Sequence, residues 1–115
     1  MLGLGQNGHL GFNEPGSAPD SRGRVLDLDP VSIAANKKWF SGDYAPAKGA
    51  TVGLKTILEA RRVLILAFGP HKAKAVRGMA LEASSDRCPA SFLQRHPCVY
   101  AFLDKDAAAG LDPHP

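Results

Sequence analysis

Two continuous apolar runs constrain the fold of this chain more than any other feature of its sequence. One extends from Val63 to Phe68 and the other from Cys98 to Leu103. Strands covered on both faces consist of unbroken apolar residues, whereas half-exposed strands alternate apolar and polar residues. The pattern therefore predicts two parallel strands that are covered on both faces.

Helical patterns occupy the segments before and between these runs. Residues 70–83 place small and apolar side chains at helical spacing, and Pro70 suits a first helical turn. Residues 51–60 predict a second helix with Thr51 as its N-cap, and residues 90–96 predict a short third helix. Helices that alternate with strands indicate an α/β fold with a mainly parallel sheet.

The remaining segments predict a lid and a tail. Residues 17–49 are rich in Pro, Gly, Ser, Asp and Lys and hold only short apolar clusters, which is typical of an irregular lid or binding loop. Residues 105–115 contain too little apolar material to pack, so we expect a disordered tail. Residues 1–5 resemble the end of a strand, so the chain is expected to begin inside a fold.

Composition excludes several classes of function. The chain has 115 residues, at most one domain, and no apolar run approaches the ~18 residues of a membrane span. No signal peptide precedes the first motif, so we expect a cytoplasmic protein with no membrane partner. Cys88 and Cys98 lack metal-site spacing and are expected to be reduced thiols, and we expect no metal and no cofactor. The net charge of +3 comes from scattered basic residues, which disfavours nucleic acid and is compatible with a small anionic ligand.

The stretch GLGQNGHLGFNEPG, residues 3–16, contains the G-x-G-x-x-G spacing of a dinucleotide-binding turn. That fingerprint needs a preceding strand and a following helix whose N-terminus holds the pyrophosphate. Only Met1 and Leu2 precede the stretch, and Gly11 and Pro15 oppose a helix after it. We therefore exclude a dinucleotide site.

His9 and Glu14 are the candidate catalytic residues of this stretch. They share a glycine-rich loop after the end of an expected strand, where open α/β sheets bind ligands. A carboxylate beside an imidazole fixes its tautomer and raises its basicity, which makes an acid/base pair. Gly8 would let the backbone approach a substrate, and Asn13 adds an amide for orientation. The alternative is a structural histidine beside a solvated acid, and spacing alone leaves both open.

A candidate phosphate site follows the first apolar run, in the segment FGPHKA. Here the expected strand leads through Gly69 into a helix that begins near Pro70. A helix N-terminus presents free N–H groups, and Lys72 adds a mobile cation. The alternative is a solvated lysine in the first turn of the helix.

The glycine-rich stretch resembles the active-site motif of the glucosamine-6-phosphate deaminase (isomerase) family, which commonly reads G-x-G-x-D-G-H-[IL]-[AG]-F-N-E-P. The likeness continues in order through AANKKWF, TVGLKTILEARRVLIL, GPHKAKAV and PASFLQRHP, up to about Asp104. It implies that residues 1–104 form a partial amino-sugar-phosphate isomerase domain. The implied fold is the C-terminal half of a Rossmann-like, mainly parallel doubly wound sheet, as in sugar-phosphate isomerases, ribose-5-phosphate isomerase and CoA transferases.

The resemblance implies a reaction and the residues that perform it. The family converts glucosamine 6-phosphate, or galactosamine 6-phosphate, to the ketose phosphate and ammonia by ring opening and aldose-ketose isomerisation. His9 matches the histidine that handles the proton of the ring oxygen, and Glu14 matches the carboxylate paired with it. Lys72 matches a phosphate-binding lysine, and Lys38 stands where the family often has a phosphate-contacting arginine. Residues 24–51 correspond to the lid over the active site.

Asn7 departs from the family motif, which has aspartate at this position. An amide cannot share a proton, but it can orient His9 or the sugar by hydrogen bonds. Asparagine here resembles the galactosamine-6-phosphate branch of the family, so it tilts the expected substrate preference. We therefore keep Asn7 as a candidate catalytic residue, and Gly8 and Asn13 as candidate substrate-binding residues.

The family also has an N-terminal half, which contributes a phosphate loop and the aspartate base that moves a proton between sugar carbons. No counterpart occurs in these 115 residues. We therefore expect a chain that is incomplete for catalysis, and a homo-oligomer when full length. One alternative is a non-catalytic fragment that binds a sugar phosphate or mediates oligomerisation. Another is a 6-phosphogluconolactonase-like hydrolase, which GFNEP followed by TVGLKTIL disfavours.

Overall fold

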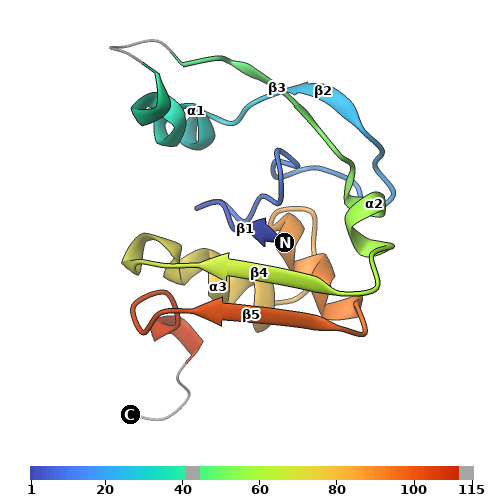
Figure 1. Ribbon diagram of the computed structural model, residues 1–115, viewed down its shortest axis with the longest axis vertical. Helices are drawn as coiled ribbons and strands as arrows, with labels where there is room; N and C mark the ends of the chain where they lie inside the picture. The colour runs from blue at the N-terminus through green and yellow to red at the C-terminus, as the bar shows by residue number, and fades with distance from the viewer. Residues whose placement is uncertain (41–44, 112–115) are drawn as a thin grey trace.

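A three-stranded parallel sheet forms the centre of the molecule (Figure 1). The computed structural model describes residues 1–40 and 45–111. Strand β4 (Val63–Ala67) lies between β1 (Leu2–Gly3) and β5 (Val99–Leu103), and both neighbours run parallel to it. Both strands predicted from the apolar runs are confirmed, as is the strand expected at the start of the chain.

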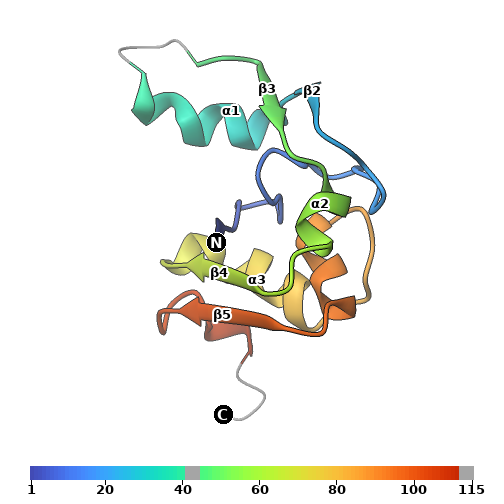
Figure 2. The same ribbon diagram turned by 45° about the vertical axis from the view of Figure 1, so that its right-hand side comes forward.

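Three helical segments connect β4 to β5, and α3 lies on one face of the sheet (Figures 1 and 2). They are the 3-10 helix η2 (Pro70–Lys72), the α-helix α3 (Ala73–Ala80) and the 3-10 helix η3 (Pro89–Arg95). The helix predicted over 70–83 is therefore shorter and opens with a 3-10 turn. The short third helix is a 3-10 helix over its whole length.

The opposite face of the sheet is only partly covered by the described residues. Tyr100 and Phe102 of β5 are 53% and 51% exposed, and their β4 partners Leu64 and Leu66 are half-buried. The prediction that both faces are covered is therefore wrong for this face. An apolar run shows that a strand is suited to burial, but coverage depends on which other elements pack against it.

The hydrophobic core lies between the sheet and the crossover helices. Helix α2 (Leu54–Leu58), which precedes β4, closes one end of this core. Its N-cap is Gly53, so the prediction of Thr51 as the cap is wrong; Thr51 ends strand β3 and its hydroxyl accepts the Phe12 N–H at 3.0 Å. The buried core residues are Leu4, Leu10, Leu54, Ile57, Val63, Ile65, Ala67, Ala75, Val76, Met79, Ala90, Phe92, Leu93 and Ala107.

The segment predicted to be irregular contains regular structure. Strand β2 (Arg24–Asp27) pairs antiparallel with β3 (Lys48–Thr51), and between them lie α1 (Pro30–Asn36) and the 3-10 helix η1 (Lys37–Trp39). Residues 41–44 of the segment lie outside the described residues. Short apolar clusters suffice here because cross-strand hydrogen bonds satisfy the backbone without a large core. Residues 24–51 are called the lid segment below.

The segment after β5 turns back onto the core, although the sequence predicts a disordered tail from Lys105. Ala107 is fully buried, and residues 109–111 form the 3-10 helix η4. The Asp104 carboxylate accepts the N–H groups of Ala107 (2.8 Å) and Gly69 (3.0 Å), and these bonds lower the pKa of Asp104. Residues 112–115, the rest of the predicted tail, lie outside the described residues.

Candidate active site

The glycine-rich loop after β1 brings the candidate catalytic pair to the carboxyl end of the sheet. Any side chain on Gly5 would overlap the His9 imidazole. Gly8 has a φ of +87°, and a Cβ there would lie 2.5 Å from the Cys88 sulfur. The conformation and this close contact account for glycine at position 8. Substrate binding by Gly8 stays a prediction.

Three oxygen atoms surround Nδ1 of His9. Asn7 Oδ1 lies at 2.8 Å, Glu14 Oε1 at 2.9 Å and Ser32 Oγ at 3.1 Å. Asn7 Oδ1 also accepts the backbone N–H of His9 at 3.2 Å, which fixes the orientation of the amide. Because amide and carboxylate oxygens only accept hydrogen bonds, the proton of the neutral imidazole lies on Nδ1. The lone pair is therefore on Nε2.

Glu14 is 6% exposed, and both of its carboxylate oxygens accept hydrogen bonds. The Ser32 hydroxyl donates to Oε1 at 2.9 Å, the Asp29 backbone N–H donates to Oε2 at 2.5 Å, and the Asn7 amide lies 3.5 Å from Oε1. Donors of this kind offset the cost of burying a charge. The interpretation of Glu14 as a solvated acid is therefore wrong.

Burial lowers the pKa of His9 below its ordinary value. Glu14 opposes this shift, and the positive charge of Lys72 adds to it. At neutral pH the imidazole is therefore neutral, and Nε2 can accept a proton. The Glu14 carboxylate would stabilise the imidazolium that forms, so the pair is arranged for acid/base chemistry.

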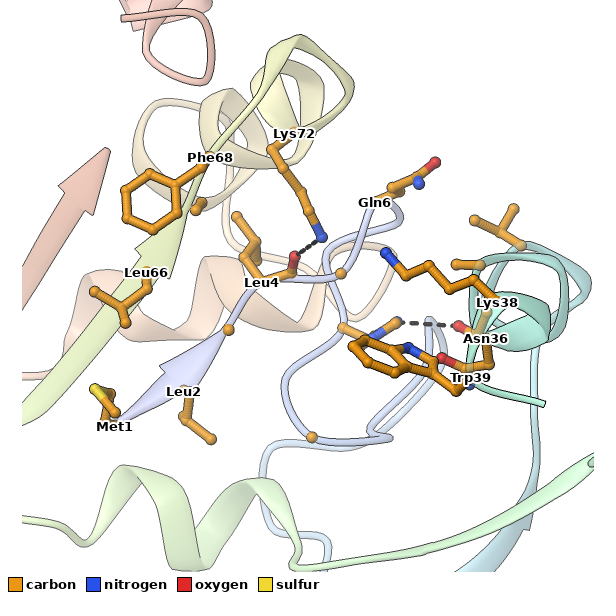
Figure 3. A pocket seen from close by; sticks show the side chains of 18 residues that line it. Met1, Leu2, Leu4, Gln6, Asn36, Lys38, Trp39, Leu66, Phe68 and Lys72 are labelled. Carbon is orange, nitrogen blue, oxygen red and sulfur yellow. Dashed lines mark hydrogen bonds between the residues drawn. The ribbon is translucent and has the colours of Figure 1, made fainter. Parts of the chain in front are cut away.

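A pocket of about 540 Å³ opens beside His9, where β1 and β4 end and the lid segment begins to cover them. Lys72 and Lys38 both extend toward its interior, from η2 and from η1 (Figure 3). The Lys72 ammonium donates to the carbonyl of Leu4 at the end of β1. Trp39 also lines the pocket, and the Lys38 ammonium lies 5.3 Å from the centre of its indole ring.

The two lysines act on one another electrostatically. Burial lowers the pKa of Lys72, and the positive charge of Lys38 lowers it further. An anion bound between them would relieve this repulsion and accept a hydrogen bond from each ammonium. The pocket therefore suits a phosphate group at the lysines and a reacting group at His9.

Asn13 does not reach this pocket, although we had predicted that it binds substrate. It is fully buried; its amide N–H groups donate to the carbonyls of Leu10 (2.8 Å) and Val52 (2.9 Å). Its side-chain oxygen accepts from Arg24 at 2.8 Å. With each of these groups engaged, Asn13 connects the catalytic loop to the lid segment.

Ser32 contacts both members of the catalytic pair, and sequence reasoning missed it. A signal was present, because Asp29 followed by Pro30 is typical of a helix start, and Ser32 is then a polar residue in the first turn among apolar neighbours. Its partners could not be predicted, because they lie 18 and 23 positions away in the chain.

No helix among the described residues is long and apolar enough to cross a membrane. In residues 1–40 and 45–111, no group of three or more His, Cys, Asp or Glu side chains is placed to hold a metal ion. Cys88 and Cys98 are free thiols.

Comparison with known proteins shows which sequences and folds the chain is similar to. No family model matches the chain. It is 50% identical over 113 residues to the glucosamine-6-phosphate deaminase of Rhodopirellula baltica, covering 97% of this chain and 45% of the relative. The solved structure of a monomeric glucosamine-6-phosphate deaminase superposes with a TM-score of 0.91 at 42% identity, covering 95% of this chain and 46% of that one. The resemblance inferred from the motif is confirmed.

A second group of solved structures shares the fold at lower identity. The 6-phosphogluconolactonase of Leishmania guyanensis superposes with a TM-score of 0.70 at 27% identity, covering 96% of this chain and 40% of that one. These structures confirm the Rossmann-like α/β fold. The chain spans slightly less than half the length of the relatives that it matches.

Proposed function

We propose that this chain carries the ring-opening and phosphate-binding part of an amino-sugar-phosphate isomerase/deaminase site. The premise is that the chain matches glucosamine-6-phosphate deaminases over nearly all of its length. The observation that carries the proposal is the arrangement around His9. Three oxygens fix the proton on Nδ1, and the residue lines the same pocket as Lys38 and Lys72.

Ring opening follows from this arrangement. With the sugar phosphate held by the two ammonium groups, Nε2 of His9 takes the proton of the anomeric hydroxyl and returns it to the ring oxygen. The C1–O5 bond breaks as the C1=O1 bond forms, and the product is the open-chain aldose. Glu14 stabilises the transient imidazolium through Nδ1–H.

The later steps need a base that moves a proton from C2 to C1 before water releases ammonia from C2. Among the described residues that line the pocket, none is Asp or Glu. Glu14 lies behind the imidazole, on the Nδ1 side. We therefore propose that this base is not among the described pocket residues, and that the isolated chain does not complete the reaction.

The lid segment is proposed to close the site, because it supplies Lys38, Trp39 and Ser32 to the pocket. Because Asn7 resembles the galactosamine-6-phosphate branch, the proposed substrate preference is for galactosamine 6-phosphate. The solved deaminase is a monomer. Two expectations for the present protein stay predictions: that it forms a homo-oligomer when full length, and that it is cytoplasmic.

The test compares the chain with a chimera. In the chimera, the 115-residue chain replaces the matching part of the Rhodopirellula baltica relative, and the rest of that relative is kept. We expect ammonia release from glucosamine 6-phosphate or galactosamine 6-phosphate by the chimera and not by the chain alone. Full activity of the chain alone would refute the proposed need for a further base.

A lactonase is the second candidate, because 6-phosphogluconolactonases share the fold. The same Nε2 could activate water for attack on a lactone carbonyl, while the lysines hold the phosphate. A chimera that hydrolyses 6-phosphogluconolactone and releases no ammonia from either amino sugar would favour this candidate over the deaminase. A chimera that does neither but still binds the sugar phosphates would favour a non-catalytic fragment.

A further inference from the structure

Ser32 contacts the catalytic pair but has no role in the ring opening proposed above. It lies in the first turn of α1, and it is 1% exposed. Its hydroxyl donates to Glu14 Oε1 at 2.9 Å and lies 3.1 Å from His9 Nδ1. Because a hydroxyl has one proton and two lone pairs, it can donate to the carboxylate and accept from the imidazole together.

The start of α1 holds the Glu14 carboxylate at both oxygens. Ser32 binds Oε1, and three positions earlier the Asp29 backbone N–H binds Oε2 at 2.5 Å. These two donors come from one turn, which the Asp29 side chain caps by accepting the Val31 N–H at 2.9 Å. The orientation of the carboxylate therefore depends on where this turn lies.

The same segment also supplies pocket groups. Val31 and Asn36 of α1 line the pocket, and the helix leads directly into η1, which carries Lys38. A movement of the lid segment that changes the position of Lys38 would therefore also change the donors on Glu14. One short helix therefore joins the segment that carries Lys38 to the donors on the Glu14 carboxylate.

We propose that Ser32 is a positioning residue that couples the lid segment to the His9–Glu14 pair and holds the Glu14 carboxylate beside Nδ1 of His9. The proposal rests on the function proposed above for its catalytic consequence. Its structural consequence, the hydrogen bonding around His9 Nδ1, concerns the chain itself and requires no turnover.

The experiment uses Ser32→Ala, Ser32→Thr and a matched control, Ser84→Ala. The Ser84 hydroxyl is buried and has no hydrogen-bond partner among the described residues, so its removal tests the loss of a serine hydroxyl alone. In the isolated chain, 15N NMR of His9 reports the tautomer and the pKa. We expect Ser32→Ala to shift the Nδ1 resonance of His9, because Nδ1 and Glu14 Oε1 both lose a hydroxyl neighbour. Ser32→Thr should restore the wild-type spectrum, and Ser84→Ala should leave it unchanged.

In the chimera, the same variants are assayed for ammonia release. Loss of a hydrogen bond to a charged group predicts that Ser32→Ala lowers kcat about tenfold or more, with KM changed less than about twofold. Ser32→Thr should recover most of the rate. Unchanged His9 resonances in a folded Ser32→Ala chain, or Ser32→Thr behaving like Ser32→Ala, would overturn the proposal. If the wild-type chimera releases no ammonia, the proposed function fails, while the NMR result still decides the role of Ser32.

Discussion

Replacing Lys72 with methionine tests the phosphate site and the electrostatics of the catalytic histidine together. The Lys72 ammonium lies in the pocket with Lys38, and its charge contributes to the lowered pKa of His9. Methionine keeps a flexible apolar stem and removes the charge. The substitution should therefore weaken phosphate binding and raise the pKa of His9.

The magnitude follows from the contact that is lost. A hydrogen bond to a charged group contributes about 1.5–3 kcal/mol, and about 1.4 kcal/mol corresponds to a tenfold change in affinity. Lys72→Met is therefore expected to weaken binding of a sugar phosphate by about 10- to 150-fold. Lys38 remains in the pocket, so some affinity should persist.

Titration calorimetry with glucosamine 6-phosphate and with glucosamine measures the first effect, since only the phosphorylated sugar should lose affinity. An NMR pH titration measures the second. Lys74→Met is the matched control, because Lys74 is an exposed lysine of α3 that does not line this pocket. Equal affinities for Lys72→Met and Lys74→Met, or a pKa of His9 that does not rise in Lys72→Met, would refute the reasoning.

Three further substitutions examine other contacts. Asn7→Asp is expected to raise the pKa of His9, measured by NMR titration, because a carboxylate replaces the amide oxygen 2.8 Å from Nδ1. Gly8→Ala is expected to lower the free energy of unfolding in urea by about 1–3 kcal/mol or more, because φ of +87° is strained for alanine and its Cβ would meet the Cys88 sulfur. Asp104→Asn is expected to flatten the acid dependence of thermal stability. The pKa of Asp104 is lowered in the folded chain, so its contribution is present above the unfolded pKa and is lost as pH falls through the folded pKa.

A control variant and the contradicting results test these three predictions. Gly16 has a φ of +95°, and a Cβ added there would have no atom within 4 Å, so Gly16→Ala reports backbone strain alone. If Gly8→Ala is no more destabilising than Gly16→Ala, the contact with Cys88 does not restrict position 8. A pKa of His9 that stays constant in Asn7→Asp, or an unchanged acid slope in Asp104→Asn, would contradict the corresponding hydrogen-bond assignment.

The sequence alone determined the features that depend on neighbouring residues. The apolar runs predicted β4 and β5 because burial in a parallel sheet requires continuous apolar side chains. His9 and Glu14 could be proposed as a pair because a short glycine-rich loop keeps them near one another in the chain. Lys72 could be predicted to lie at the carboxyl end of the sheet because it follows a buried strand within a few residues.

Only the tertiary structure decided the features that depend on distant segments. It placed the Ser32 hydroxyl against Glu14 and left Tyr100 and Phe102 exposed. It also buried Asn13 in contacts with Val52 and Arg24, away from the pocket. The physical reason is the same in each case. A side chain's residue type fixes what it can donate, accept or bury, but its partners are set by packing between segments that the local sequence does not specify.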